Sequence, residues 1–155
     1  MPLSLHVDGQ KWRSHLSQMA SAKPGLVPVI KGNGYGVTCK GGFRVNGTAA
    51  NPVIFTSIKD DNQGNPQDTN GDGNGSTPSS NEAPGVYFGP TSDDSYCKLY
   101  YLKHYYGGIP WGAYDYNTYG VVHIESANPL IDRCLFTNLP SSYVGVGVYG
   151  NSTPT

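Results

Sequence analysis

The sequence predicts a mainly β fold, a solenoid of short strands preceded by a short strand–helix–strand segment. The chain of 155 residues holds 21 Gly, 12 Pro and 12 Tyr, and only 14% of its residues are charged. This composition favours many short strands joined by turns over long helices. A small polar turn before a proline recurs at Pro129 and Pro154, 25 residues apart (154 − 129), and a third copy precedes Pro52. A period of 25 suits one coil of a β-solenoid.

The first segment, residues 3–31, has the pattern of a strand, a helix and a second strand. Apolar and polar residues alternate over 3–7, as in a half-buried strand. Over about 9–22 the apolar residues repeat with a helical period, which places them on one face of a helix. The apolar run over 26–30 is typical of a buried strand. We expect the helix to cover the open N-terminal end of the solenoid and the second strand to enter its first coil.

The segment LHVDG…LVPVIKGNGYG resembles the first strand, first helix and second strand of the alanine racemase family. In that family the lysine of a K-x-N-x-Y-G motif forms a Schiff base with pyridoxal phosphate. The matching residue here is Lys31. The resemblance therefore implies a lysine that binds pyridoxal phosphate at this position.

The racemase chemistry is not expected to survive in this chain. The family needs a closed barrel of about 250 residues and a tyrosine base from a second domain, whereas residues 37–155 show no alternation of strands and helices. An isolated lysine keeps an ordinary ammonium, which is a poor nucleophile at neutral pH. We expect Lys31 to be a solvated residue at a strand end, and a remnant pyridoxal phosphate activity is an alternative.

After residue 36, short apolar triplets separated by Gly, Asn and Pro each predict a strand. The stretches VNGTAANPVIFTSIKDD and GVVHIESANPLIDRCLFTN resemble right-handed parallel β-helix proteins of bacteria. This resemblance implies the fold and leaves the activity open, because the fold hosts lyases, hydrolases, adhesins and passive stalks. The predicted strands are Phe43–Val45, Val53–Thr56, Val86–Phe88, Lys98–Leu102, Val121–Ile124, Cys134–Phe136 and Val144–Val148.

The two resemblances together predict a chimera of recombined segments, or a de novo protein. Residues 1–36 would form a racemase-like cap and residues 37–155 the β-helix coils. Two insertions interrupt these coils. The insertion at 60–84 is rich in Asn, Asp, Gly, Ser and Pro, and the insertion at 107–118 is rich in Gly and aromatic residues. Because neither shows apolar periodicity, we expect exposed loops.

In the first insertion, Asp68, Asn70 and Asp72 match the first half of an EF-hand calcium loop, D-x-N-x-D-G. Oxygen ligands at alternate positions, with a Gly at the sharp turn, are what calcium requires. The glutamate of the twelfth position is missing, because Ser79 stands there. Two interpretations remain, a calcium site and a solvated Asx-turn loop.

Aromatic residues are concentrated between residues 96 and 119. Exposed aromatic rings can stack on sugar rings, so a glycan-binding face is one interpretation. The other is that alternating tyrosines cover the side of the solenoid and direct their hydroxyls to solvent. The residues are Tyr96, Tyr100, Tyr101, Tyr105, Tyr106, Trp111, Tyr114, Tyr116 and Tyr119.

Candidate catalytic groups are sparse. Polysaccharide cleavage needs paired carboxylates, or calcium together with a base. Adjacent residues of a strand point to opposite faces, so the aspartate pairs at 60–61 and 93–94 do not predict an acid–base couple. Asp132 and Arg133 with His123 form a mixed group on predicted strands, but an exposed salt bridge explains it better. We expect no enzyme, with a polysaccharide lyase or hydrolase as an alternative.

Charge and cysteine content narrow the function classes further. The net charge of −1 provides no basic field toward nucleic acid or an anionic membrane. No apolar run is long enough to span a bilayer, and the opening MPLSLHVDGQ lacks the pattern of a signal peptide. We expect a cytoplasmic chain with an extracellular parent β-helix. Cys39, Cys97 and Cys134 are odd in number, which predicts buried thiols and no disulfide framework, with Cys97 and Cys134 stacked in successive coils.

The expected function is that of a folded, non-catalytic β-helix domain that self-associates. Residues 144–155 hold an apolar strand without charge, and the free edge of such a strand is a template for pairing. We expect a homodimer closed through this end of the solenoid. The alternative is a carbohydrate-binding or cell-surface module that uses the tyrosine face.

Overall fold

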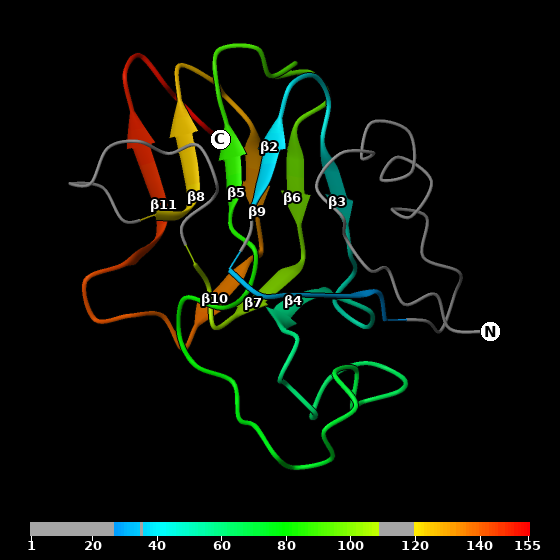
Figure 1. Ribbon diagram of the computed structural model, residues 1–155. Helices are drawn as coiled ribbons and strands as arrows, with labels where there is room; N and C mark the ends of the chain where they lie inside the picture. The colour runs from blue at the N-terminus through cyan, green and yellow to red at the C-terminus, as the bar shows by residue number, and fades with distance from the viewer. Residues whose placement is uncertain (1–26, 35, 109–119) are drawn as a thin grey trace.

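The computed structural model describes residues 27–34, 36–108 and 120–155 (Figure 1). These residues form eleven strands and no helix, and among them no helix could cross a membrane. The mainly β class is confirmed, whereas the helix expected over 9–22 lies outside the described residues. The strands are β1 (Val29–Gly32), β2 (Val37–Cys39), β3 (Arg44–Asn46), β4 (Val53–Ser57), β5 (Val86–Phe88), β6 (Lys98–Tyr100), β7 (Leu102–Tyr105), β8 (Gly120–Glu125), β9 (Leu130–Asp132), β10 (Leu135–Thr137) and β11 (Val144–Tyr149).

The strands form three sheets in which every pair is parallel. Sheet A has the order β1-β4-β7-β10, sheet B the order β11-β8-β5-β2, and sheet C the order β3-β6-β9. The chain visits sheets A, B and C in turn and then returns to sheet A, so each round of three strands lies beside the next (Figure 1). Stacked parallel strands of this kind are β-helix-like, as the sequence predicts.

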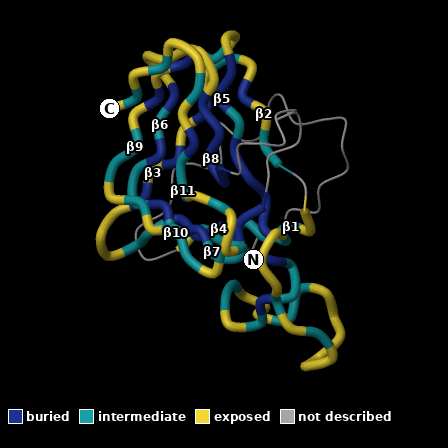
Figure 2. The backbone as a smooth tube through the Cα atoms, turned by 90° about the vertical axis from the view of Figure 1, so that its left-hand side faces the viewer, coloured by how far each residue is buried: buried dark blue, intermediate teal, exposed yellow. Residues whose placement is uncertain are grey.

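The register carries the predicted period. Val29 lies beside Ile54, 25 residues later (54 − 29), and Gly120 lies beside Val144, 24 residues later (144 − 120). The step from β4 to β7 is longer because the chain between β4 and β5 holds the first insertion. That insertion projects away from the strands in both views of the molecule (Figures 1 and 2).

Two predicted strands have wrong boundaries, for a shared reason. The strand expected over Lys98–Leu102 is divided into β6 and β7, because Tyr101 adopts a left-handed backbone (φ 50°) and turns the chain from sheet C to sheet A. One round later Arg133 (φ 53°) turns the chain at the same corner. The strand expected over Cys134–Phe136 therefore begins at Leu135. Residues other than glycine adopt this backbone only rarely, so the pattern of apolar residues did not predict these turns.

The repeated proline turn is confirmed in part. Asn128 and Thr153 occupy equivalent turns, because the Thr153 amide and hydroxyl both donate to Asn128 Oδ1. The Asn128 amide in turn donates to Asp94 Oδ1 (2.7 Å) in the preceding round. Pro52 is not a third member of this column, because it precedes β4 in sheet A, whereas Pro129 precedes β9 in sheet C.

The core lies between the three sheets. Phe55 and Leu102 of sheet A, Phe88 and Ile124 of sheet B, and Leu99 of sheet C are fully buried, and Figure 2 shows the buried strands against exposed turns. Burial of an apolar side chain of this size stabilises the fold by about 1.5–3 kcal/mol.

The cysteines do not pair as expected. Cys97 Sγ lies 3.5 Å from Cys39 Sγ, and Cys134 Sγ instead faces the Leu99 carbonyl oxygen (3.4 Å). The stacking of Cys97 on Cys134 was therefore a wrong prediction, because Arg133 ends the strand before Cys134 and moves this residue to a corner. The expected stacking of the strands that carry Val86 and Val122 is confirmed.

Candidate functional site

Lys31 ties the first strand to the first insertion. It stands in β1 beside Thr56 of β4. Its ammonium donates hydrogen bonds to the carbonyl oxygens of Asp60 (2.7 Å) and Gln67. A Cβ on Gly64 would lie only 3.3 Å from Lys31 Cε. The expectation of a solvated lysine is wrong, because the insertion folds back over its side chain.

The surroundings of Lys31 do not fit pyridoxal phosphate, the cofactor that the racemase resemblance implies. Burial lowers the pKa of Lys31 below its ordinary value, while the carboxylates of Asp60, Asp61 and Asp68 oppose this shift. A Schiff base would require the cofactor beside Nζ, where the backbone of the insertion already lies. Two carbonyl acceptors also hold this nitrogen in place as a hydrogen-bond donor. The contacts describe a structural tie.

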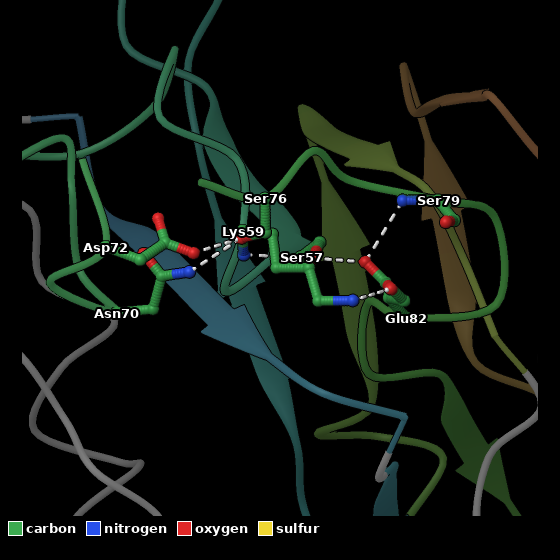
Figure 3. A network of polar contacts seen from close by, with 7 residues as sticks. All are labelled: Ser57, Lys59, Asn70, Asp72, Ser76, Ser79 and Glu82. Atoms are coloured by element: carbon green, nitrogen blue, oxygen red, sulfur yellow. Dashed lines mark hydrogen bonds and ion pairs between the residues drawn. The ribbon is translucent and has the colours of Figure 1, made fainter. Parts of the chain in front are cut away.

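A polar network around Glu82 closes the base of the insertion (Figure 3). Glu82 Oε1 accepts a hydrogen bond from Lys59 Nζ (2.6 Å), and Oε2 accepts from Ser57 Oγ (2.7 Å) and the Ser79 amide (3.0 Å). Burial opposes ionisation of Glu82, yet the hydrogen bonds from Lys59 and Ser57 hold its pKa below the ordinary value. The network therefore joins the end of β4 to the far end of the insertion.

The segment that resembles a calcium loop is closed on its own backbone. The Asp68 carboxylate accepts hydrogen bonds from the backbone amides of residues 71–73, at 2.7, 3.2 and 2.9 Å. Asn70 Nδ2 donates to Ser76 Oγ (3.0 Å), which donates to Asp72 Oδ2 (2.6 Å) (Figure 3). These bonds form the Asx-type alternative.

The calcium ligand set does not assemble in this conformation. Calcium requires six to eight oxygen ligands directed at one point, whereas both Asp68 oxygens are directed at backbone N–H groups. Across the part of the chain that the structure describes, no group of three or more His, Cys, Asp and Glu residues could hold a metal ion. Calcium binding at Asp68, Asn70 and Asp72 stays a prediction.

The outer face of sheet C carries cations interleaved with tyrosines. Burial alternates along β3 and β6, with Val45 and Leu99 turned inward, so their neighbours in the strand point outward. Arg44 lies beside Lys98 in the register. We call the resulting set the cation–tyrosine strip, and its members are Arg44, Tyr96, Lys98, Tyr100, Tyr101 and Arg133.

In this strip a cation lies against each tyrosine ring. The Arg44 guanidinium carbon lies 5.2 Å from the centre of the Tyr96 ring, and Lys98 Nζ lies 4.5 Å from the centre of the Tyr100 ring. A cation within about 6 Å of the centre of an aromatic ring is attracted to it. The interaction fixes both side chains along the face of the sheet.

Arg133 completes the strip at the corner between sheets C and A. Its Nη1 donates hydrogen bonds to the hydroxyls of Tyr100 and Tyr101, each at 2.8 Å. The two rings meet edge to face, with centres 4.7 Å apart. Arg133 therefore orders both rings while its own side chain stays 56% exposed.

The strip is exposed and positively charged. Tyr96 is 57% exposed. The Asp132 carboxylate, 3.8 Å from Arg133 Nε, offsets one of the three positive charges, which leaves +2 (3 − 1) on a chain whose net charge is −1. The strip is thus a local cationic and aromatic surface on a weakly acidic chain.

The tyrosine-rich stretch does not form one face. Tyr105 ends β7 in sheet A and Tyr106 follows it at the next corner, so both lie away from sheet C. The aromatic residues from 111 to 119 lie outside the described residues. Sequence reasoning also missed Arg44 and Lys98, although their position one residue before an inward apolar residue was a usable signal.

The mixed group expected from His123, Asp132 and Arg133 is not brought together. His123 is 3% exposed and lies on sheet B between the rings of Tyr87 and Tyr149, with ring centres 5.4 and 4.4 Å away. Asp132 and Arg133 lie at the edge of sheet C. The geometry therefore provides no shared acid–base site for these residues.

The adjacent aspartates serve turns. Asp60 is buried and accepts a hydrogen bond from Thr56 Oγ1 (2.5 Å). Asp93 accepts from the amide and hydroxyl of Ser95, whereas Asp94 bonds to the following round at Asn128. Each carboxylate has a structural partner.

Comparison of the chain with protein-family models, with curated proteins and with solved structures found no match. The function must therefore be argued from the residues and the geometry above.

Proposed function

We propose that this chain is a non-catalytic binding module, built on a right-handed parallel β-helix, whose cation–tyrosine strip binds acidic polysaccharide. The observation that carries the proposal is the pairing of exposed cations with ordered tyrosine rings along one sheet face. Neighbouring strands lie about 4.8 Å apart, so the strip presents groups in a row rather than at one point. A row of this kind suits a chain-like ligand.

The strip matches the chemistry of an acidic sugar. A tyrosine ring provides a flat apolar surface for the C–H face of a sugar ring, and its hydroxyl provides a polar end. A guanidinium binds a carboxylate or sulfate with two parallel hydrogen bonds. The free donors of Arg44 and Arg133 and the ammonium of Lys98 favour uronate or sulfate groups over neutral sugars.

The right-handed coil and the cap are part of the proposal. Parallel strands joined by a crossover in one sheet are right-handed in nearly all proteins, and the strands of sheet A are parallel and joined in this way. We infer that residues 1–36 are a remnant of a racemase retained as a cap. The pairing of β1 with β4 supports a structural role for this segment, and so does the enclosed ammonium of Lys31.

A glycan array tests this function. We expect retention on glycans that carry uronate or sulfate groups and none on neutral glycans of equal length. Binding to neutral glycans alone, or to none, would contradict the proposal. New reducing ends or unsaturated products after incubation would show a hydrolase or lyase and would overturn the non-catalytic part.

A second candidate, self-association, is favoured by the last strand of sheet B. β11 is the terminal strand of that sheet. Val144 and Val148 are 52% and 45% exposed, although they stack on Gly120 and Ile124 of the buried β8. β11 has no charged residue, so a second copy can approach it without repulsion. We propose a two-fold dimer paired through this edge.

Sedimentation velocity at micromolar concentration tests the dimer. The wild type should sediment as a dimer and Val148→Lys as a monomer. Val27→Lys is the matched control, because Val27 is also an exposed valine and lies outside this edge. A monomeric wild type, or equal behaviour of the two variants, would rule out pairing through β11.

A further inference from the structure

We propose that Cys39 and Cys97 form a disulfide when the protein meets a small-molecule disulfide such as oxidised glutathione. Their Sγ atoms lie 3.5 Å apart, and both residues are buried, at 4% and 2% exposure. The two cysteines are 58 residues apart in the chain (97 − 39), so this contact is a product of the fold. The bond would create a covalent link between the first and second rounds of strands.

The two thiols share one acceptor beneath a surface turn. Cys39 ends β2, and Cys97 directly precedes β6. Both thiols donate to the Gly41 carbonyl oxygen, Cys39 at 2.8 Å and Cys97 at 3.3 Å. Lys40 and Gly42 on either side are exposed, so movement of this short turn gives an oxidant access to the sulfurs. Gly41 itself has a φ of 145°, a backbone that favours glycine and lets the turn fold over the pair.

The oxidation is a pair of exchange steps. One cysteine thiolate attacks a sulfur of oxidised glutathione, which forms a mixed disulfide and releases one glutathione thiolate. The second cysteine thiolate then attacks the protein sulfur of the mixed disulfide and releases the second glutathione thiolate. Two protons leave the protein thiols, glutathione gains two electrons, and one Sγ–Sγ bond forms. Burial raises the pKa of Cys97 to about 12, so the reaction should be faster at higher pH.

Cys134 is not part of this pair. Its Sγ faces the carbonyl oxygens of Leu99 and Asp132, each at 3.4 Å. It lies at the corner after β9, and it is less buried than the other two cysteines. The odd number of cysteines is therefore compatible with one disulfide and one free thiol.

The disulfide would stabilise the solenoid where it carries its first insertion. The closed loop from Cys39 to Cys97 includes the whole segment between β4 and β5. A crosslink removes conformations of the unfolded chain, and more of them for a longer loop. For a loop of this length we expect the melting temperature to rise on the order of 10 °C on oxidation.

The experiment is oxidation of the full chain with a glutathione redox buffer, followed by non-reducing peptide mapping. We expect a mass loss of two hydrogen atoms, one remaining free thiol, and a crosslinked peptide that joins Cys39 to Cys97. Cys134→Ser should form the same crosslink and show the same rise in melting temperature. Cys39→Ser should lose both.

The mapping of the wild type does not depend on how well any variant folds. Three free thiols after equilibration with the oxidant would overturn the proposal. A crosslink that includes Cys134 in place of Cys39 or Cys97 would also overturn it. So would a Cys39–Cys97 crosslink that forms only in denaturant, because the fold would then not bring the sulfurs together.

Discussion

The ammonium of Lys98 lies 4.5 Å from the centre of the Tyr100 ring, although the two side chains come from one strand of three residues. Both residues point away from the core, because Leu99 between them is fully buried. The same inward residue therefore anchors the hydrophobic core and sets the spacing of the surface that we propose to bind glycans. Stability of the coil and geometry of the strip are coupled through β6.

The first prediction concerns the core. Phe55→Ala should lower the free energy of unfolding by about 3–5 kcal/mol, because it removes a fully buried ring from the centre of sheet A. Leu135→Ala is the matched control, since this side chain is 48% exposed and its loss should cost less than about 1 kcal/mol. Urea unfolding of the two variants gives both values. Similar losses would mean that sheet A does not enclose the core.

The second prediction concerns acid stability. His104 is buried between the rings of Phe55 and Phe136. Burial lowers its pKa to about 4, although the hydrogen bond to the Pro84 carbonyl oxygen opposes this shift. The ordinary pKa is 6.5, so between pH 6.5 and pH 4 the unfolded chain binds more protons than the folded chain. Stability is therefore lost as the pH falls through this window.

From this difference we expect the free energy of unfolding to fall by roughly 2 kcal/mol between about pH 7.5 and about pH 5. Urea unfolding at the two pH values measures it. His104→Phe keeps an aromatic ring in the stack and removes the titrating group, so its pH dependence should be flatter by that amount. Equal slopes for wild type and His104→Phe would show that His104 is not buried in neutral form.

The third prediction concerns calcium. Because the Asp68 carboxylate is occupied by three backbone amides, millimolar calcium should leave the melting temperature unchanged. Asp68→Ala should loosen the loop in the same way with and without calcium, which limited proteolysis of the first insertion measures. A rise in melting temperature with calcium that is absent in Asp72→Asn would instead establish a metal site.

Sequence patterns predicted the parts of the fold that depend on side-chain alternation. The strands at Val53 and Val86 and their stacking partners follow from apolar periodicity. The corners did not, because the left-handed backbone of Tyr101 and Arg133 has no glycine or proline to mark it. A sequence of adjacent apolar residues therefore seemed to continue where the chain in fact turns.

The candidate site was predictable only in outline. The cluster of tyrosines indicated a surface, but its division between sheets C and A depends on the turn at Tyr101. The partners of Lys31 could not be predicted, because the carbonyl oxygens of Asp60 and Gln67 reach it only after the insertion folds back. Contacts between segments that are far apart in the chain have no local sequence signal.

The most direct test of the account compares two lysines by calorimetric titration with an acidic polysaccharide. Lys98 and Lys103 lie on neighbouring sheets with similar partial burial, but only Lys98 belongs to the strip. Lys98→Ala should weaken binding about tenfold, a loss of roughly 1.4 kcal/mol, and Lys103→Ala should bind as the wild type does. Equal affinities for the two variants, or a wild type that binds no acidic polysaccharide, would contradict a binding function of the cation–tyrosine strip.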